Sequence, residues 1–490
     1  MSRTEVFNGG AFSPFWWHDK ETCYHNKFRV TLDHEVDSEL LRKAWDKTKR
    51  VYPLIDWIPD IKDGNVIFYK EDGDNAPVRS KSPVLPGTKE TAGRVFGLTY
   101  FENTVTMNAY HSIVDGGGIN MIFSTLIYFY LAAYTGHSDQ MPPVMIKEGR
   151  DPAEYFIPLS SVDRGDFERQ SLITYPKRKG MFIDLSMCPD DAGNIDIARI
   201  KVPVDQFIKS CKSIGANPSA MLAVLMAKAA YILHPDRSGD LAFVLTMSAR
   251  GAFGIQESIA NCSANLLIPV EYGDIMGEDI GAAAAKIRAV IDYQRQQDYL
   301  KTLTDFYETY DWILAKRYAF LTYIGKLDIG NNTKHIKAFE MTDDSTDSIY
   351  MMELNGEFVI SFQFGKVTET YMKTIMDILS EFGIESEIET EPYHIIKDAA
   401  VAVCAEKGTV HKLFKHSSYG KEVFGLENKE DLYLAYGPRN LFWLMDHYND
   451  IHIRFSAELD HEIDGALMEK AWEDTIRVYP VIGCVIEMEG

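Results

Sequence analysis

The sequence predicts an α/β protein built as two lobes with mixed sheets, followed by the start of a second tandem copy of the same domain. Three observations support this prediction. The chain has 490 residues, 46% of them hydrophobic, which is enough for more than one large core. Segments with strand alternation and segments with helical spacing follow one another along most of the chain. A long stretch near the N-terminus then reappears near the C-terminus.

The internal repeat relates the two ends of the chain. Residues 28–58 match residues 455–485 without a gap, and 16 of the 31 positions are identical. The shift of 427 residues, seen in Trp45 and Trp472, is far longer than a solenoid repeat of about 20–50 residues, so it indicates a duplicated domain. The equivalent of His111 would be residue 538, beyond Gly490, so we expect the second copy to be truncated.

The expected elements divide the chain into parts. The first lobe is expected to contain strands at Phe28–Leu32 and Val66–Tyr69, a helix after the N-cap Asp37, a hairpin of Arg94–Phe101 and Thr104–Tyr110, and an apolar helix at Ile119–Tyr134. The second is expected to contain helices at Val204–Ser213, Pro218–Leu233 and Gly277–Tyr299, and strands at Leu241–Met247, Asn265–Val270, Ile349–Leu354 and Phe358–Phe364. We therefore expect an N-terminal lobe at 1–175, a C-terminal lobe at 176–390, a linker at 391–426 and the repeated domain at 427–490.

Charge, cysteine spacing and the absence of certain segments argue against nucleic acid, metal, secretion and a membrane span. The formal net charge is -22, from 50 Lys and Arg against 72 Asp and Glu, which opposes binding to the anionic backbone of nucleic acid. The six cysteines have neither Cys-x-x-Cys nor zinc-site spacing, so we expect reduced thiols and no metal. No secretory signal is visible, and a cytoplasmic location is expected. The apolar run Ile119–Tyr134 is shorter than a membrane span of about 20 residues and predicts a buried helix.

The segment His111–Gly116, with the pattern His-x-x-x-Asp-Gly, contains residue types suited to acid–base chemistry. Alternation in the preceding strand puts His111 on the same core-facing side as Val105 and Met107. An imidazole has an ordinary pKa of about 6.5, so it can accept a proton from a hydroxyl, amine or thiol at neutral pH. We therefore expect His111 to be a general base.

The residues after His111 are expected to shape the loop. Gly116 and Gly117 permit close backbone approach, and N–H groups of this turn or of the helix start are suited to stabilise the oxyanion that forms when a thioester is attacked. Asp115 is expected to shape the loop rather than to take a proton. The alternative interpretation is that the short pattern is only a strand-end histidine followed by an Asx turn.

These features together resemble the superfamily of chloramphenicol acetyltransferases and peptide-synthetase condensation domains. The resemblance rests on the hairpin strand, the His111 loop and the apolar helix, and it extends to Ser248–Gly251 and Thr322–Gly325. It covers roughly residues 10–390 and is closest to the alcohol acetyltransferase-like and condensation-like branches. It implies direct transfer from an acyl thioester to a small alcohol or amine, with His111 as base and no covalent acyl-enzyme. It also implies acyl-CoA as a co-substrate and no bound cofactor.

The resemblance further implies that Asp115 is structural and meets an arginine. Arg250 is the candidate, and a solvated surface arginine is the alternative for this residue. Condensation domains usually carry a second histidine just before the catalytic one, whereas this chain has Tyr110 there. Tyr110 and the third glycine, Gly118, favour a free-standing acyltransferase.

Two other functions stay open at this point. A condensation-type domain would act on thioesters bound to a carrier protein, although the linker lacks the Gly-Gly-x-Ser motif of carrier proteins. A non-catalytic binding domain would keep the fold without the reaction. Among the other histidines, His34 is matched by His461 within the repeated Leu-Asp-His-Glu, and we expect it to have a turn or surface role.

Overall fold

The structure is a computed structural model that describes residues 4–11, 25–173 and 195–393. Short internal gaps fall at 63–64, 72, 74, 89, 112, 140, 142–144, 164, 234, 236–240, 278, 310–318, 328, 343–346 and 365–368. The elements below lie in one compact unit formed by residues 1–61 and 65–408, except that the last residue of one strand, Lys62, falls outside it. The expected linker beyond residue 393 and the expected repeated domain at 427–490 lie outside the described residues.

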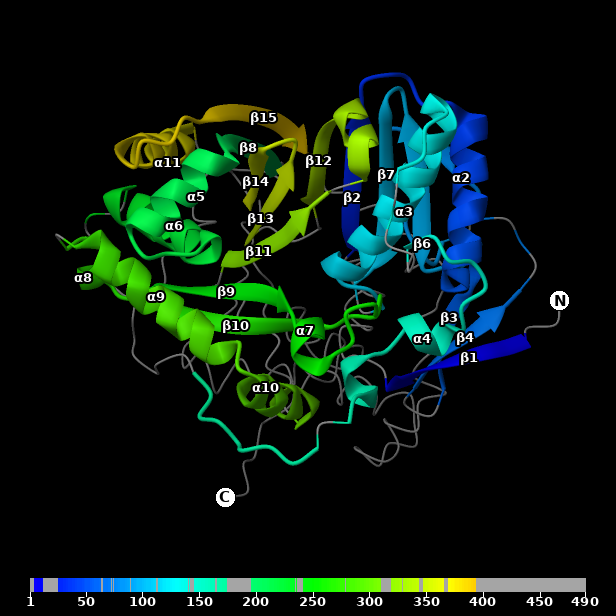
Figure 1. The fold of residues 1–490 in the computed structure, drawn as a ribbon, viewed down its shortest axis with the longest axis horizontal. Coiled ribbons are helices and arrows are strands. Elements are labelled where there is room, and N and C mark those ends of the chain that lie inside the picture. The colour runs from blue at the N-terminus through cyan, green and yellow to red at the C-terminus, as the bar shows by residue number, and fades with distance from the viewer. Residues whose placement is uncertain are drawn as a thin grey trace, which may run out of the picture. The chain divides into compact units, whose positions relative to one another are not determined.

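The N-terminal lobe is built on a five-stranded sheet with the order β12-β2-β7-β6-β5 (Figure 1). Its strands are β2 (His25–Leu32), β5 (Val78–Arg79), β6 (Phe96–Phe101), β7 (Thr104–Tyr110) and β12 (Ile336–Thr342). Helices α2 (Ser38–Val51) and α3 (Gly116–Thr135) pack against each other, and α3 packs on β2. Phe28 of β2 and Phe123 of α3 meet in this core with ring centroids 6.1 Å apart. The predicted first strand, hairpin and two helices are confirmed, as is the N-cap Asp37, which accepts from the N–H groups of Glu39 and Leu40.

A smaller three-stranded sheet accompanies this lobe. It contains β1 (Thr4–Ala11), β4 (Asn65–Lys70) and β3 (Ile58–Lys62), in the order β1-β4-β3. Phe7 of β1 stacks on Phe68 of β4 and contacts Phe156 edge to face, just after α4 (Pro152–Tyr155). These aromatic contacts join β1, the first strand of the lobe, to the residue that follows α4.

The C-terminal lobe is built on a mixed seven-stranded sheet with the order β10-β9-β11-β13-β14-β8-β15. The strands are β8 (Ile195–Pro203), β9 (Leu241–Ser248), β10 (Ser263–Val270), β11 (Ala319–Lys326), β13 (Asp347–Leu354), β14 (Glu357–Phe364) and β15 (Glu387–Tyr393). Strand β11 runs parallel to β9 and β13, and the other pairs are antiparallel. The helices of this lobe are α5 (Val204–Ser213), α6 (Pro218–Leu233), α7 (Arg250–Phe253), α8 (Tyr272–Ile275), α9 (Ile280–Gln294), α10 (Gln297–Thr309) and α11 (Glu369–Glu381). The predicted α/β class with mixed sheets is confirmed.

One strand from the second half of the chain returns to the first lobe. Strand β12 follows β11 in the chain but pairs antiparallel with β2, at the edge of the N-terminal sheet. Glu340 of β12 is buried and forms ion pairs with Arg29 of β2 and Arg199 of β8. This crossing links the two sheets, and nothing in the local sequence pattern predicted it.

The long helix predicted at Gly277–Tyr299 is instead divided into two helices, α9 and α10, with a break at Arg295 and Gln296. Gln294 is the last residue of α9, directly before the break. Its buried side-chain amide accepts from the N–H of Leu267 and donates to the carbonyl of Leu267, so it pairs with the free edge of strand β10 as a neighbouring strand would. The hydroxyl of Tyr299, in the next helix, donates to the same amide oxygen.

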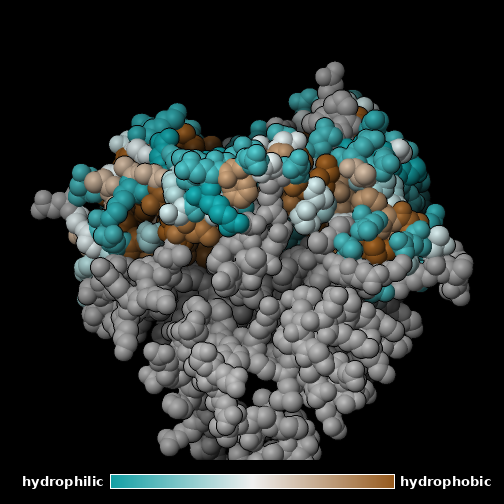
Figure 2. Space-filling view, turned by 90° about the horizontal axis from the view of Figure 1, so that it is seen from below, coloured by the Kyte–Doolittle hydropathy of each residue, from teal (hydrophilic) through white to brown (hydrophobic). Residues whose placement is uncertain are grey.

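Helix α3 is long and apolar enough to cross a membrane, but 61% of its most apolar stretch is buried inside the protein. The helix pair α5 and α6 passes the same test only if both are counted as one span with an 83° bend. Helix α3 and the α5–α6 pair each pack inside their own lobe, as expected of core helices. In the view of Figure 2 the described residues show a mixed surface of hydrophilic and hydrophobic side chains.

Candidate active site

His111 lies one residue beyond the end of β7 and is half-buried. The side chain of Asn261 holds it from the other lobe: its Nδ2 donates to the carbonyl of His111 at 2.8 Å and lies 3.4 Å from His111 Nδ1. The Asn261 Oδ1 accepts from the N–H and the hydroxyl of Ser263, at 3.1 and 2.6 Å, which fixes the orientation of the amide. Sequence reasoning missed Asn261, which stands 150 residues from His111 in the chain.

The side chain of Tyr110 points away from this loop. It is buried, and its hydroxyl donates to the carbonyl of Pro86 at 3.0 Å. Gly87 adopts φ +71, and a Cβ there would collide with the Tyr110 hydroxyl. Tyr110 therefore anchors the loop between β5 and β6.

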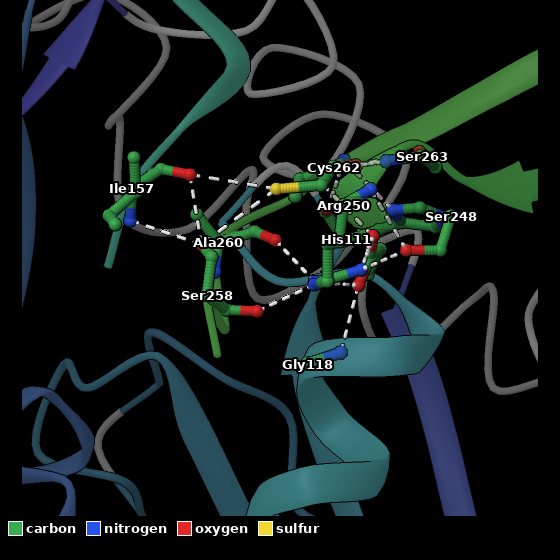
Figure 3. A network of polar contacts seen from close by, with 11 residues as sticks. His111, Gly118, Ile157, Ser248, Arg250, Ser258, Ala260, Cys262 and Ser263 are labelled. Atoms are coloured by element: carbon green, nitrogen blue, oxygen red, sulfur yellow. Dashed lines mark hydrogen bonds and ion pairs between the residues drawn. The ribbon is translucent and has the colours of Figure 1, made fainter. Parts of the chain in front are cut away.

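Asp115 is the N-cap of α3 and accepts four hydrogen bonds, within the polar network of Gly118, Arg250 and Cys262 that Figure 3 shows. Its Oδ1 accepts from the N–H of Gly118 at 2.8 Å and from Arg250 Nη2 at 2.6 Å. Its Oδ2 accepts from Arg250 Nη1 at 2.8 Å and from the N–H of Cys262 at 2.9 Å. A carboxylate has about four acceptor positions, so Asp115 is fully occupied as a structural group.

Arg250 is buried, which excludes the surface alternative for this residue. Besides its bidentate pair with Asp115, its Nε donates to the carbonyl of Ser258 at 2.6 Å and its Nη2 to that of Ala260 at 2.7 Å. Its Nη1 also contacts the hydroxyl of Ser248 at 3.1 Å. The guanidinium thus joins the start of α3 to the chain between α7 and β10.

The ionisation of these groups follows from their burial and from the ion pair. Burial raises the pKa of Asp115, but the charge and hydrogen bonds of Arg250 outweigh it, and the pKa is lowered overall. Burial lowers the pKa of Arg250, but the charge and hydrogen bonds of Asp115 outweigh this effect, and the pKa is raised overall. Burial raises the pKa of Cys262 to about 12, so this neighbouring thiol stays protonated and is a poor nucleophile at neutral pH.

Main-chain hydrogen bonds hold the same segment, residues 258–262, against the first lobe. The N–H of Ile259 donates to the carbonyl of Tyr155 at 2.7 Å, and the N–H of Asn261 donates to that of Ile113 at 2.9 Å. We call residues 258–262 the clasp. The clasp contacts the loop of residues 111–115 through both its backbone and its side chains.

The glycines at the start of α3 allow this close contact. A Cβ on Gly118 would overlap the carbonyl oxygen of Ile259, and a Cβ on Gly117 would lie 2.9 Å from Arg250 Nη1. Both positions need a residue without a side chain, because the carbonyl of Ile259 and the guanidinium of Arg250 occupy the space. Gly116 and Gly117 carry the first two N–H groups of the helix. The third, on Gly118, donates to Asp115.

Gly116 faces a different part of the second lobe. A Cβ there would lie 2.7 Å from Ile324 Cδ1 of β11 and 3.3 Å from Met341 Sδ of β12. Apolar side chains of two strands therefore pack directly on the start of α3. The structure brings His111, Asp115, Gly116, Gly117 and Arg250 into one constellation at the junction of the two lobes.

We expect Gly118→Ala to destabilise the protein by about 1–3 kcal/mol, because the methyl group overlaps the Ile259 carbonyl and the clasp must shift. The free energy of unfolding from chemical denaturation measures this. Gly251→Ala is the matched control, since a Cβ at Gly251 meets nothing within 4 Å. Equal stability of the two variants would show that the clasp does not need Gly118.

We expect Asp115→Asn to lower the free energy of unfolding by about 3–5 kcal/mol at pH 7, because it leaves the buried Arg250 without a counter-charge. The pKa of Asp115 is lowered in the folded state, so its contribution is complete above the unfolded-state pKa of about 3.9 and is lost as pH falls below it. Denaturation at a series of pH values should therefore show the two proteins converging in acid. A constant difference down to the lowest pH would contradict this role.

Comparison with known proteins supports the fold. No protein-family model and no curated protein sequence matches the chain. Among solved structures, TRI101 of F. graminearum, complexed with coenzyme A and T-2 mycotoxin, is similar with a TM-score of 0.52 at 12% identity, over 78% of this chain and 100% of that one. Polyketide synthase associated protein 5 from Mycobacterium tuberculosis has a TM-score of 0.54 at 12% identity, over 77% and 98%.

A third similar structure is the epimerization domain from the third module of tyrocidine synthetase B. It has a TM-score of 0.50 at 10% identity, over 82% of this chain and 98% of that one. The comparisons establish the fold at identities too low to assign a substrate. The chain has the two-lobed fold of the chloramphenicol acetyltransferase and condensation-domain superfamily.

Proposed function

We propose that this protein is an acyltransferase that moves an acyl group from acyl-CoA to a small alcohol or amine. The observation that carries the proposal is the placement of His111: a half-buried imidazole stands at a strand end and is fixed by Asn261 of the opposite lobe. A base that is held by both lobes can act on two substrates that meet between them.

The proposed reaction is a direct transfer. His111 takes the proton from the acceptor hydroxyl or amine as its oxygen or nitrogen attacks the thioester carbonyl carbon. The tetrahedral intermediate collapses with cleavage of the carbon–sulfur bond, and His111 returns the proton to the leaving thiolate. We assign the base role to Nε2, the ring nitrogen of His111 that does not face the side chain of Asn261.

The oxyanion of the intermediate needs donors that are already in position. The N–H groups of Gly116 and Gly117 begin α3, a helix of 20 residues whose N-terminus carries partial positive charge. We assign oxyanion stabilisation to these two groups. Asp115 and Arg250 act through the loop as positioning residues, since their hydrogen-bonding capacity is used in holding one another and the clasp.

The similar structures support the choice of donor. TRI101 is bound to coenzyme A together with a small organic molecule, which is the pairing of donor and acceptor that we propose here. The tyrocidine synthetase domain comes from one module of a synthetase. A donor bound to a carrier protein is therefore the second candidate for this chain. The resemblance to the alcohol acetyltransferase-like branch and a cytoplasmic location remain parts of this proposal.

Thiol release distinguishes the two donors. The purified chain is incubated with free acyl-CoAs and a panel of small alcohols and amines, and the freed thiol is measured. We expect release that depends on the acceptor. Release only from a thioester bound to a carrier protein would favour the second candidate, and no turnover with either donor would favour a non-catalytic domain.

We expect His111→Gln to reduce acceptor-dependent turnover by about 10²- to 10⁴-fold, because a general base typically contributes that factor. The melting temperature should change little, since the main-chain carbonyl that binds Asn261 is kept. His137→Gln is the control, because His137 is an exposed histidine. If turnover of the His111 variant equals that of the control, His111 is not the base.

A further inference from the structure

A second group of polar residues lies away from the His111 loop. Asp33 directly follows β2, and His335 ends a short 3-10 helix just before β12. The pairing of β2 with β12 brings them together, and the N–H of Asp33 donates to the carbonyl of His335 at 3.0 Å. His34 is the next residue in the chain. The three residues therefore meet because of the strand crossing rather than because of sequence proximity.

The two imidazoles face the carboxylate at hydrogen-bond distances. His34 Nδ1 lies 2.6 Å from Asp33 Oδ1, and His335 Nδ1 lies 2.9 Å from Asp33 Oδ2. One ligand atom from each residue lies within 4.8 Å of the others. Ligand atoms around a tetrahedral zinc ion are about 3.3 Å apart, so an ion would enter after small side-chain rotations. It would take the place of the two ring hydrogens that now point at the carboxylate.

The surroundings of His34 resemble those of a metal-bound imidazole. Its ring stacks on Tyr134 with centroids 3.7 Å apart and an angle of 5°, and its Nε2 lies 3.3 Å from the hydroxyl of Tyr130. That hydroxyl also accepts from the N–H of Asp37 at 3.0 Å. A hydrogen bond at the second ring nitrogen fixes the orientation and tautomer of ligating histidines. The hydroxyl of Tyr130 already occupies this position beside His34.

Charge and access also suit a cation. Asp33 supplies a carboxylate, and both imidazoles already contact it. The side chains are 30%, 12% and 23% exposed, which leaves a route for an ion and for a water ligand. Two imidazoles and one carboxylate are typical ligands for zinc and neighbouring transition metals, whereas calcium and magnesium prefer all-oxygen sites.

We propose that Asp33, His34 and His335 form a binding site for a divalent transition metal of the zinc class, completed by water. The ion joins the end of β2, the start of β12 and, through Tyr130 and Tyr134, helix α3. It stabilises the crossing of β12 into the first lobe. The spacing of cysteines and histidines in the sequence gave an expectation of no metal. It could not predict this site, because His335 lies 302 residues from Asp33.

The test is metal binding by the full chain after treatment with a chelator. We expect one Zn²⁺ per chain by titration calorimetry, a rise in melting temperature with Zn²⁺ but not Mg²⁺, and visible absorption typical of four-coordinate Co²⁺ when Co²⁺ is used. His335→Asn should weaken the affinity at least tenfold and remove the rise in melting temperature. His34→Asn should do the same, so the test does not depend on one variant folding.

His335 is the most informative position because it has no counterpart within residues 427–490. Asp460 and His461 repeat Asp33 and His34 in sequence, whereas the equivalent of His335 would be residue 762, outside this chain. His137→Asn is the control for loss of an exposed histidine and should bind as the wild type does. Wild-type binding no tighter than that of the His34→Asn, His335→Asn double variant, or a six-coordinate Co²⁺ spectrum, would overturn the proposal.

Discussion

The buried ion pair of Asp115 and Arg250 is the interaction on which the site depends. A carboxylate and a guanidinium at this depth are costly unless every donor and acceptor has a partner. Here the carboxylate accepts four hydrogen bonds and the guanidinium also binds two carbonyls of the clasp. The pair therefore fixes three segments at once: the start of α3, the end of β9 and the clasp. Removal of either partner leaves the other as an unpaired charge inside the protein.

The rest of the site follows from that fixed point. Because the clasp is held by Arg250, its Ile259 carbonyl sits where only a glycine fits on α3, and its Asn261 amide reaches the carbonyl of His111. The imidazole is thus positioned by a lobe to which it does not belong. Glu340 of β12, paired with Arg29 and Arg199, adds a second charged link between the sheets. Precise placement of a base needs such support from outside its own loop.

Sequence reasoning predicted the local parts of this arrangement and missed most of the long-range ones. The strand before His111, the helix after Asp115 and the N-cap Asp37 are set by spacing within a few turns of chain, so their patterns were readable. The contact of Arg250 with Asp115 was suggested by resemblance. Asn261, the crossing of β12 and the meeting of Asp33 with His335 depend on residues that are distant in sequence, and a single sequence holds no record of such neighbours.

The division of the expected helix at Gly277–Tyr299 has the same cause. The predicted helix runs through the polar stretch Gln294–Asp298, and the break falls there, next to Gln294, whose amide bonds the edge of β10. A glutamine on a helix is ordinarily a solvent-facing residue, so its partner strand had to be known first. Local periodicity thus predicted the type of structure but not where the helix ends.

A double-mutant cycle on Asp115 and Arg250 tests the central claim most directly. The free energy of unfolding and the acyl-transfer rate are measured for the wild type, Asp115→Asn, Arg250→Met and the double variant. If the pair holds the loop to the clasp, the double variant is less destabilised than the sum of the single variants by about 1–3 kcal/mol, and either single variant alone loses most of the rate. Additive effects on stability, together with a rate that survives each change, would show that His111 is positioned by something else.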